Sequence, residues 1–206
     1  MGTRTRVTQS SATLAHGKTI MHRQPLLDLL AEYETRHRTE ADLIVRFRAF
    51  VATQERCFQR DLWAGHVTGS AWLVNAARDA VLLTHHRKLG RWLQLGGHSD
   101  GNPDALAVAI AEAEEESGLA VQALAPFAFD LDIHEIPARK QDPAHFHFDV
   151  RFVLQAVGSE TFRVSAESLD LAWVPIERLS EYTDEQSMLR MAEKWRAGDW
   201  QRQAFR

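Results

Sequence analysis

The chain has 206 residues, of which 45% are apolar and 25% charged, as expected for a soluble globular protein and not for a disordered chain, a collagen-like repeat or a disulfide-stapled miniprotein. A net charge of −4 does not favour general nucleic-acid binding, so long nucleic acid is not an expected partner. No apolar run approaches the ~20 residues of a membrane span, and the single cysteine, Cys57, fits a reducing compartment, which together predict a cytoplasmic protein.

The N-terminal part is predicted to be a flexible tail over residues 1–24, followed by a helical extension over 25–66. The start of the tail is basic, rich in Ser and Thr and free of acidic residues, which leaves an organelle transit peptide as the alternative. Helices are expected over 25–35 and 39–60, where apolar residues recur at helical spacing. We expect this extension to pack on the following domain, over 67–206, or to support a homodimer.

Residues 67–206 are predicted to form one mixed α/β domain. Alternating apolar and polar residues, turns and helix-capping residues predict, in order, a strand hairpin (71–76 and 80–86), a Gly-rich loop (95–102), a helix (103–117), three strands (127–136, 145–154 and 171–175) and a last helix (185–197). The helix 103–117 has the clearest ends, with Asn102 as the predicted N-cap and Gly118 as the C-terminal stop.

Three carboxylates share one face of the predicted helix 103–117. Glu112, Glu115 and Glu116 follow the i, i+3, i+4 spacing, and no Lys or Arg lies between Arg91 and Arg139. Like charges so placed repel one another, unless a hard divalent cation such as Mg²⁺ or Mn²⁺ is their partner. A solvated acidic face is the alternative. The apolar stripe of this helix is predicted to be Leu106, Ile110, Ala113 and Ser117.

The segment 96–119, GGHSDGNPDALAVAIAEAEEESGL, resembles the Nudix box of the Nudix hydrolase family. The matching positions are Gly97, Glu112, Glu115, Glu116, Gly118 and Leu119, with Ala113 in the aliphatic position. The resemblance implies an α/β/α sandwich around a mixed β-sheet. It also implies a pyrophosphohydrolase that cleaves a nucleoside diphosphate linked to another moiety.

Two box positions depart from the family pattern, because Pro103 replaces a Glu and Ala111 replaces an Arg. Asp100 or Asp104 could take over part of the acidic role, and Arg151 could take over that of the missing Arg. The departures also leave an alternative function open, a catalytically weak Nudix-like module that binds a nucleotide as a sensor.

The resemblance implies a role for each matching residue. The Gly97 carbonyl, Glu112, Glu115 and Glu116 would hold Mg²⁺ or Mn²⁺, and Glu115 or Glu112 would also be the catalytic residue that accepts a proton. Other candidates for this base lie outside the helix: Glu135, Asp184 and Glu185.

The run His145-Phe-His147-Phe-Asp149 allows three interpretations. It matches the start of the zinc motif of metallo-β-lactamase-like hydrolases, but Val150 stands where that motif has a further His. In a strand these polar residues share one face, which could form the wall of a substrate cleft or a solvated surface. With the cleft, we expect His147, His134 and Arg139 to bind substrate.

Overall fold

The computed structural model describes residues 22–139, 142–166 and 168–198, so most of the predicted tail lies outside the described residues. The first elements are the helices α2 (Gln24–Arg36), η1 (Arg38–Glu40) and α3 (Ala41–Thr53). They are followed by β1 (His66–Val74), β2 (Ala80–His86), β3 (Arg91–Leu93), β4 (Leu95–His98), α4 (Ala105–Ser117), β5 (Val121–Ala123), β6 (Asp130–Ile136), β7 (His145–Ala156), β8 (Ser168–Pro175), η2 (Ile176–Glu181) and α5 (Gln186–Ala197).

The strands form one mixed sheet whose centre is the parallel pair β1 and β7. This pair runs in register from His66 opposite His147 to Val74 opposite Gln155. All other pairings are antiparallel: β4 lies beside β1, β6 and β5 lie beside β7, and β2 carries β3 and β8. The first halves of β1 and β7, together with β4 and β6, therefore come together in one region of the sheet.

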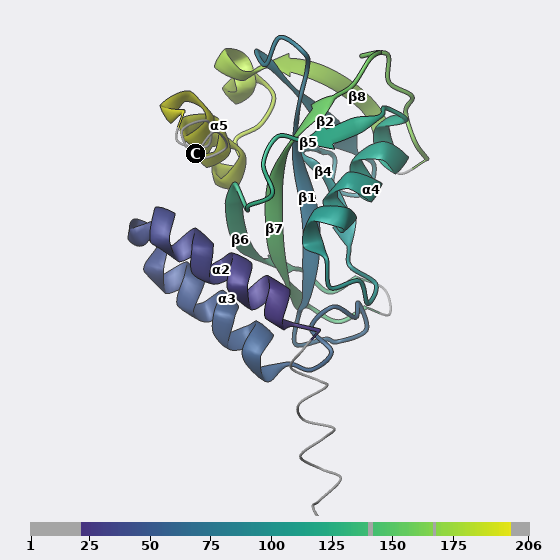
Figure 1. Cartoon of the computed structure of the whole chain (residues 1–206). Helices are drawn as coiled ribbons and strands as arrows, with labels where there is room; N and C mark the ends of the chain where they lie inside the picture. The colour runs from purple at the N-terminus through teal and green to yellow at the C-terminus, as the bar shows by residue number, and fades with distance from the viewer. Residues whose placement is uncertain (1–21, 140–141, 167, 199–206) are drawn as a thin grey trace, which may run out of the picture.

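Helices cover both faces of this sheet (Figure 1). On β1, Val67 and Ala71 point into a core shared with α2, α3 and α4, whereas Trp72 points into a second core that contains Met188 and Met191 of α5. Gly69 lets α4 approach closely, because a Cβ there would lie 2.6 Å from the Ala105 carbonyl oxygen. The predicted α/β/α sandwich with N-terminal helices is confirmed.

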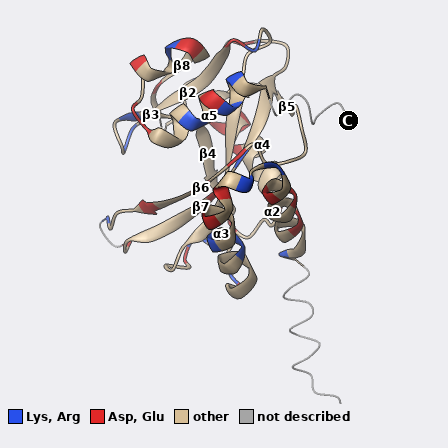
Figure 2. Ribbon diagram, turned by 90° about the vertical axis from the view of Figure 1, so that its left-hand side faces the viewer, with Lys and Arg blue, Asp and Glu red and all other residues tan. Residues whose placement is uncertain are grey.

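Acidic residues predominate on α2, whereas α3 and α5 carry both acidic and basic residues (Figure 2). No helix within the described ranges is long and apolar enough to cross a membrane.

Several predicted boundaries are wrong. Helix α3 ends at Thr53 and not at residue 60, and the short strands β3, β4 and β5 were not expected. Helix α4 begins at Ala105, with Asp104 as its N-cap in place of Asn102, and the Asp104 side chain accepts from the Ala107 N–H at 3.0 Å. Its buried face is Ala105, Val108, Ala109, Ala113, Glu116 and Ser117, so Leu106 and Ile110 are only half-buried.

The helices α2 and α3 share their apolar core with the sheet. The Phe50 ring stacks on Phe148 of β7 with centroids 3.7 Å apart, and Phe47 meets the same ring edge-on. The expectation that the extension packs on the domain fits this contact, whereas the homodimer and the boundary at residue 66 stay predictions.

We expect Ile44→Val to lower the free energy of unfolding by about 0.5–1.5 kcal/mol, because Ile44 is fully buried in this shared core. Urea denaturation of the whole chain measures the change. Val45→Ala is the control, since Val45 is 61% exposed on the same helix. An unchanged midpoint for Ile44→Val would show that the helix is not part of the cooperative core.

Candidate functional site

The strand β4 and the helix α4 bring glycine backbone and carboxylates together. The Gly96 N–H donates to Glu116 Oε1 at 2.9 Å. Glu112 lies so close to Gly97 that a Cβ on this glycine would be 2.2 Å from Glu112 Oε1. A side chain at this position would therefore displace the Glu112 carboxylate.

The three predicted carboxylates differ in burial. Glu116 is 9% exposed, Glu112 is half-buried and Glu115 is exposed. The structure therefore places Glu112 and Glu116 against the glycine strand and leaves Glu115 at the outer side of the helix. Two carboxylates and the backbone carbonyl of a glycine are an oxygen donor set, which fits a hard divalent cation such as Mg²⁺ or Mn²⁺.

The residues considered as replacements for the two lost box positions have other partners. Asp104 caps α4, and Asp100 forms an ion pair with Arg60. Arg151 lies on β7 and binds aspartates on the sheet, with its Nε 2.7 Å from Asp149 Oδ2. Ala111 is exposed on α4.

Among the candidates for a base outside α4, Glu135 is exposed on β6 and Glu185 forms an ion pair with Arg91. Both carboxylates therefore lie outside β4 and α4, the two elements that hold the glycines and the helix carboxylates. The helix carboxylates Glu112 and Glu115 stay the candidates implied by the family resemblance.

A buried cluster of charges occupies the sheet face opposite α4. Arg151 is 2% exposed and contacts Asp149, Asp130 and Asp132, at 2.7, 3.0 and 3.3 Å. Asp149 also accepts hydrogen bonds from the hydroxyls of Thr68 and Ser70, at 2.8 and 2.7 Å. The solvated-surface interpretation of this strand face is therefore wrong, and Asp149 is held by protein groups.

The same cluster connects the sheet to helices at both ends of the chain. Asp130 is fully buried and binds Arg190 and Lys194 of α5, each at 2.7 Å. The Lys194 ammonium in turn binds the Tyr33 hydroxyl of α2 at 2.7 Å and Glu40 at 2.6 Å. Burial and the neighbouring Asp130 and Glu40 raise the pKa of Tyr33, which keeps this hydroxyl protonated.

The charge cluster predicts acid sensitivity. Burial alone would raise the pKa values of Asp130 and Asp132, but their hydrogen bonds and the positive charges of Arg151 and Arg190 lower both pKa values below 3.8. The unfolded chain therefore binds protons on these groups near pH 4 while the folded chain does not. The stability they give above pH 4 is lost as the pH falls through their lower folded pKa values.

Urea denaturation between pH 6 and pH 3 measures this dependence. We expect Asp132→Asn to make the fall below pH 4 shallower than in the unaltered chain, and the exposed Asp170→Asn to leave it unchanged. If stability falls equally steeply with pH in Asp132→Asn and in the unaltered chain, Asp132 is not a source of the acid sensitivity.

The predicted substrate-binding residues are only partly brought together. His134 and His147 face each other across paired strands, with ring centroids 5.4 Å apart, and His134 Nδ1 lies 3.0 Å from Asp132 Oδ2. Arg139 lies exposed beyond the end of β6 and donates to the Lys88 carbonyl at 3.0 Å.

Two further histidines, which sequence reasoning missed, complete this region. His66 of β1 and His98 of β4 approach His147, with ring centroids 4.8 and 5.2 Å away. Burial and the neighbouring histidines lower the pKa of His66 to about 4 and that of His147 to about 2, so both rings are neutral at pH 7. The even spacing of His66, Thr68 and Ser70 was the available signal for a polar strand face.

Comparisons with known proteins agree with this architecture. A family model described as NUDIX domain matches residues 65–195. A NUDIX-family hydrolase from Clostridium perfringens is 25% identical with a TM-score of 0.51, and the match covers 63% of this chain and 95% of that one. No curated protein matches.

Two other solved structures are less similar. An Ap4A hydrolase from C. elegans is 17% identical with a TM-score of 0.47, over 64% of this chain and 95% of that one. The NUDIX domain of NrtR from Shewanella oneidensis, solved with ADP ribose, is 16% identical with a TM-score of 0.45, over 72% and 96%.

Proposed function

The chain belongs to the Nudix hydrolase family, whose members act on phosphoric anhydrides, and from this premise we propose that it is a metal-dependent pyrophosphohydrolase. Its substrate would be a nucleoside diphosphate linked to another moiety. The observation that supports the proposal most strongly is the contact of Glu112 and Glu116 with the glycine pair of β4. A cytoplasmic location is part of the proposal, and the buried, unpaired Cys57 fits it.

Glu112, Glu116 and the Gly97 carbonyl would hold Mg²⁺ or Mn²⁺, with Glu115 added from the exposed side of α4. When bound, the cation would neutralise charge on the diphosphate and lower the pKa of a water molecule. The Gly96 N–H orients the Glu116 carboxylate, so this ligand is fixed before substrate arrives. Glu112 and Glu115 are the groups proposed to accept the proton of the attacking water.

The histidine-lined sheet face shares strand β4 with this site, because His98 directly follows Gly97 there. We place the substrate against this face, with His134 and His147 as polar contacts. Arg139 would reach a substrate phosphate only from beyond the end of β6, so it is the weakest member of the proposed set.

A panel of diphosphate substrates, assayed with Mg²⁺, with Mn²⁺ and with chelator, tests the proposal. ADP-ribose, a dinucleoside polyphosphate, an oxidised nucleoside triphosphate, a nucleotide sugar and capped RNA share the diphosphate group and make up the panel. Metal-dependent release of nucleotide from one of them supports the hydrolase. Nucleotide binding without turnover would favour the sensor and would make Pro103 and Ala111 the residues to revert to Glu and Arg.

A further inference from the structure

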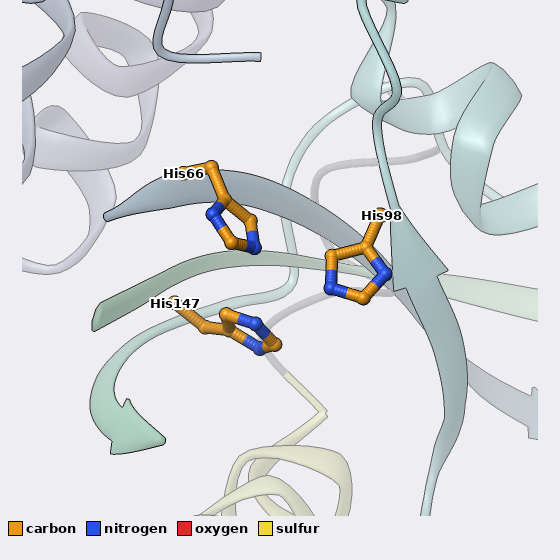
Figure 3. Close-up of side chains that lie close together, drawn as sticks. All are labelled: His66, His98 and His147. Atoms are coloured by element: carbon orange, nitrogen blue, oxygen red, sulfur yellow. The ribbon is translucent and has the colours of Figure 1, made fainter. Parts of the chain in front are cut away.

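Three histidines from three adjacent strands turn their rings toward one common space (Figure 3). His66 lies opposite His147 in the parallel register of β1 and β7, and His98 lies opposite Thr68 in the pairing of β1 with β4. Their candidate ligand nitrogens all lie within 4.8 Å of one another. In the part of the chain that the structure describes, this is the one group of three His, Cys, Asp or Glu residues that meets this criterion.

The burial of these rings is unusual for histidines that bind only protein groups. His66 is 1% exposed, yet its ring nitrogens make no well-aligned hydrogen bond, their contact with the Leu62 backbone being a weak one, and His147 Nε2 is buried without a partner. A buried polar atom without a partner loses the free energy of its contact with water. A cation bound between the rings would be the partner of one nitrogen of each ring.

We propose that His66, His98 and His147 form a second metal site, which binds Zn²⁺ and is separate from the carboxylate site of the proposed function. Imidazole nitrogen suits Zn²⁺, whereas Mg²⁺ and Mn²⁺ prefer oxygen. Three histidines leave one position of a tetrahedral ion for water or for a ligand from outside the chain.

The geometry requires only a small closure of the site. Zn–N bonds of ~2.0–2.1 Å in a tetrahedral ion place ligand nitrogens roughly 3.4 Å apart, compared with at most 4.8 Å here. Rotation of the half-buried His98 and His147 side chains can supply this movement, while His66 is held by burial. The bound ion would connect β1, β4 and β7 next to Gly97.

The surroundings contain groups that orient neighbouring rings and balance charge. His145 Nδ1 lies 2.8 Å from the Pro143 carbonyl oxygen, and the His145 ring stacks beside His66 with centroids 4.9 Å apart. Asp132 binds the His134 ring, which flanks His147. The positive charge of Arg60 would repel a cation bound at His66. Asp100 neutralises the Arg60 charge in an ion pair.

Asp149, the last residue of the run His145-Phe-His147-Phe-Asp149, is not part of this site. Asp149 is engaged by Arg151 and by two hydroxyls, so the metallo-β-lactamase-like ligand set is not assembled. The proposed trio takes only His147 from that motif and adds two histidines from other strands.

Co²⁺ titration of the whole chain tests the proposal. The protein is freed of metal with chelator, the chelator is removed, and Mg²⁺ is added in excess to compete for the carboxylates. We expect one equivalent of Co²⁺ to give the intense visible bands of a four-coordinate, nitrogen-ligated ion, and Zn²⁺ to abolish them. Only the faint bands of a six-coordinate, oxygen-ligated ion would overturn the proposal.

Substitutions assign the bands to residues. His98→Gln and His147→Gln should each raise the Co²⁺ dissociation constant at least about 100-fold, since even residues behind a ligand change metal affinity by 10–100-fold. His85→Gln is the matched control, because His85 is a half-buried strand histidine stacked on Trp92. Unchanged binding in both ligand variants, or equal loss in the control, would contradict the site.

Two further measurements separate the proposed Zn²⁺ site from the carboxylate site and from any effect of the substitutions on folding. Glu116→Gln should lose hydrolysis and keep the Co²⁺ bands, so failure of the hydrolase proposal and failure of this one are distinguishable. X-ray absorption of the Zn²⁺-loaded, unaltered chain should show nitrogen ligands with imidazole scattering at about 2.0 Å. A shell of oxygen ligands alone would overturn the proposal without reliance on any variant.

Discussion

Glu116→Gln is expected to lower kcat/KM of the metal-dependent hydrolysis by about 10³-fold, which corresponds to ~4 kcal/mol of transition-state stabilisation. Glu116 is buried beside the glycine strand and its carboxylate is oriented by the Gly96 N–H. The amide of glutamine keeps the size of the side chain but removes the charge that a divalent cation needs. The measurement is steady-state turnover of whichever panel substrate is active, at saturating Mg²⁺.

Glu114→Gln is the matched control on the same helix. Glu114 is exposed, and its carboxylate accepts a long hydrogen bond, 3.4 Å, from the Val121 N–H. The control removes the same charge from the same helix, so unchanged turnover there excludes a general effect of charge. Full activity of Glu116→Gln would contradict the proposed ligand set, whereas retained nucleotide binding with lost turnover agrees with the hydrolase.

The sequence predicted the parts of the site that depend on short-range spacing. Gly97, Glu112 and Glu116 lie within one short strand and the helix that follows it, and helical periodicity relates the two carboxylates directly. Sheet pairing could not be derived in the same way. That β1 lies parallel to β7, and so brings His66 to His147, depends on packing between segments about 80 residues apart.

The burial of polar groups was also beyond local reasoning. The alternation of β7 shows that Asp149 and Arg151 share a face, but not that α5 would supply Arg190 and Lys194 to cover it. The α4 boundary was misplaced for a smaller reason, because Asn102 and Asp104 are both good N-cap residues and only the loop conformation selects Asp104.

Arg151→Met is expected to lower the free energy of unfolding by about 3–5 kcal/mol, the usual cost of removing one partner from a buried ion cluster. Arg151 is 2% exposed and contacts three aspartates, two of which are almost completely buried. Methionine fills much of the volume but leaves the Asp149 carboxylate with the hydroxyls of Thr68 and Ser70 and the amide of Gln94 as donors, and without the charge of Arg151. At roughly 2–4 °C per kcal/mol for a chain of this size, Tm should fall by about 6–20 °C.

Arg48→Met is the control that removes an exposed ion pair, so it shows how much of the stability loss in Arg151→Met is due to burial. Arg48 binds Glu34 at 2.6 Å, but its side chain is 45% exposed, so we expect a loss below about 1 kcal/mol. Urea denaturation at pH 7 compares the two variants with the unaltered chain. Equal, small losses in both would show that Arg190 and Lys194 alone satisfy the aspartates. A large loss in Arg151→Met alone would establish that this arginine holds the sheet face on which the substrate is proposed to lie.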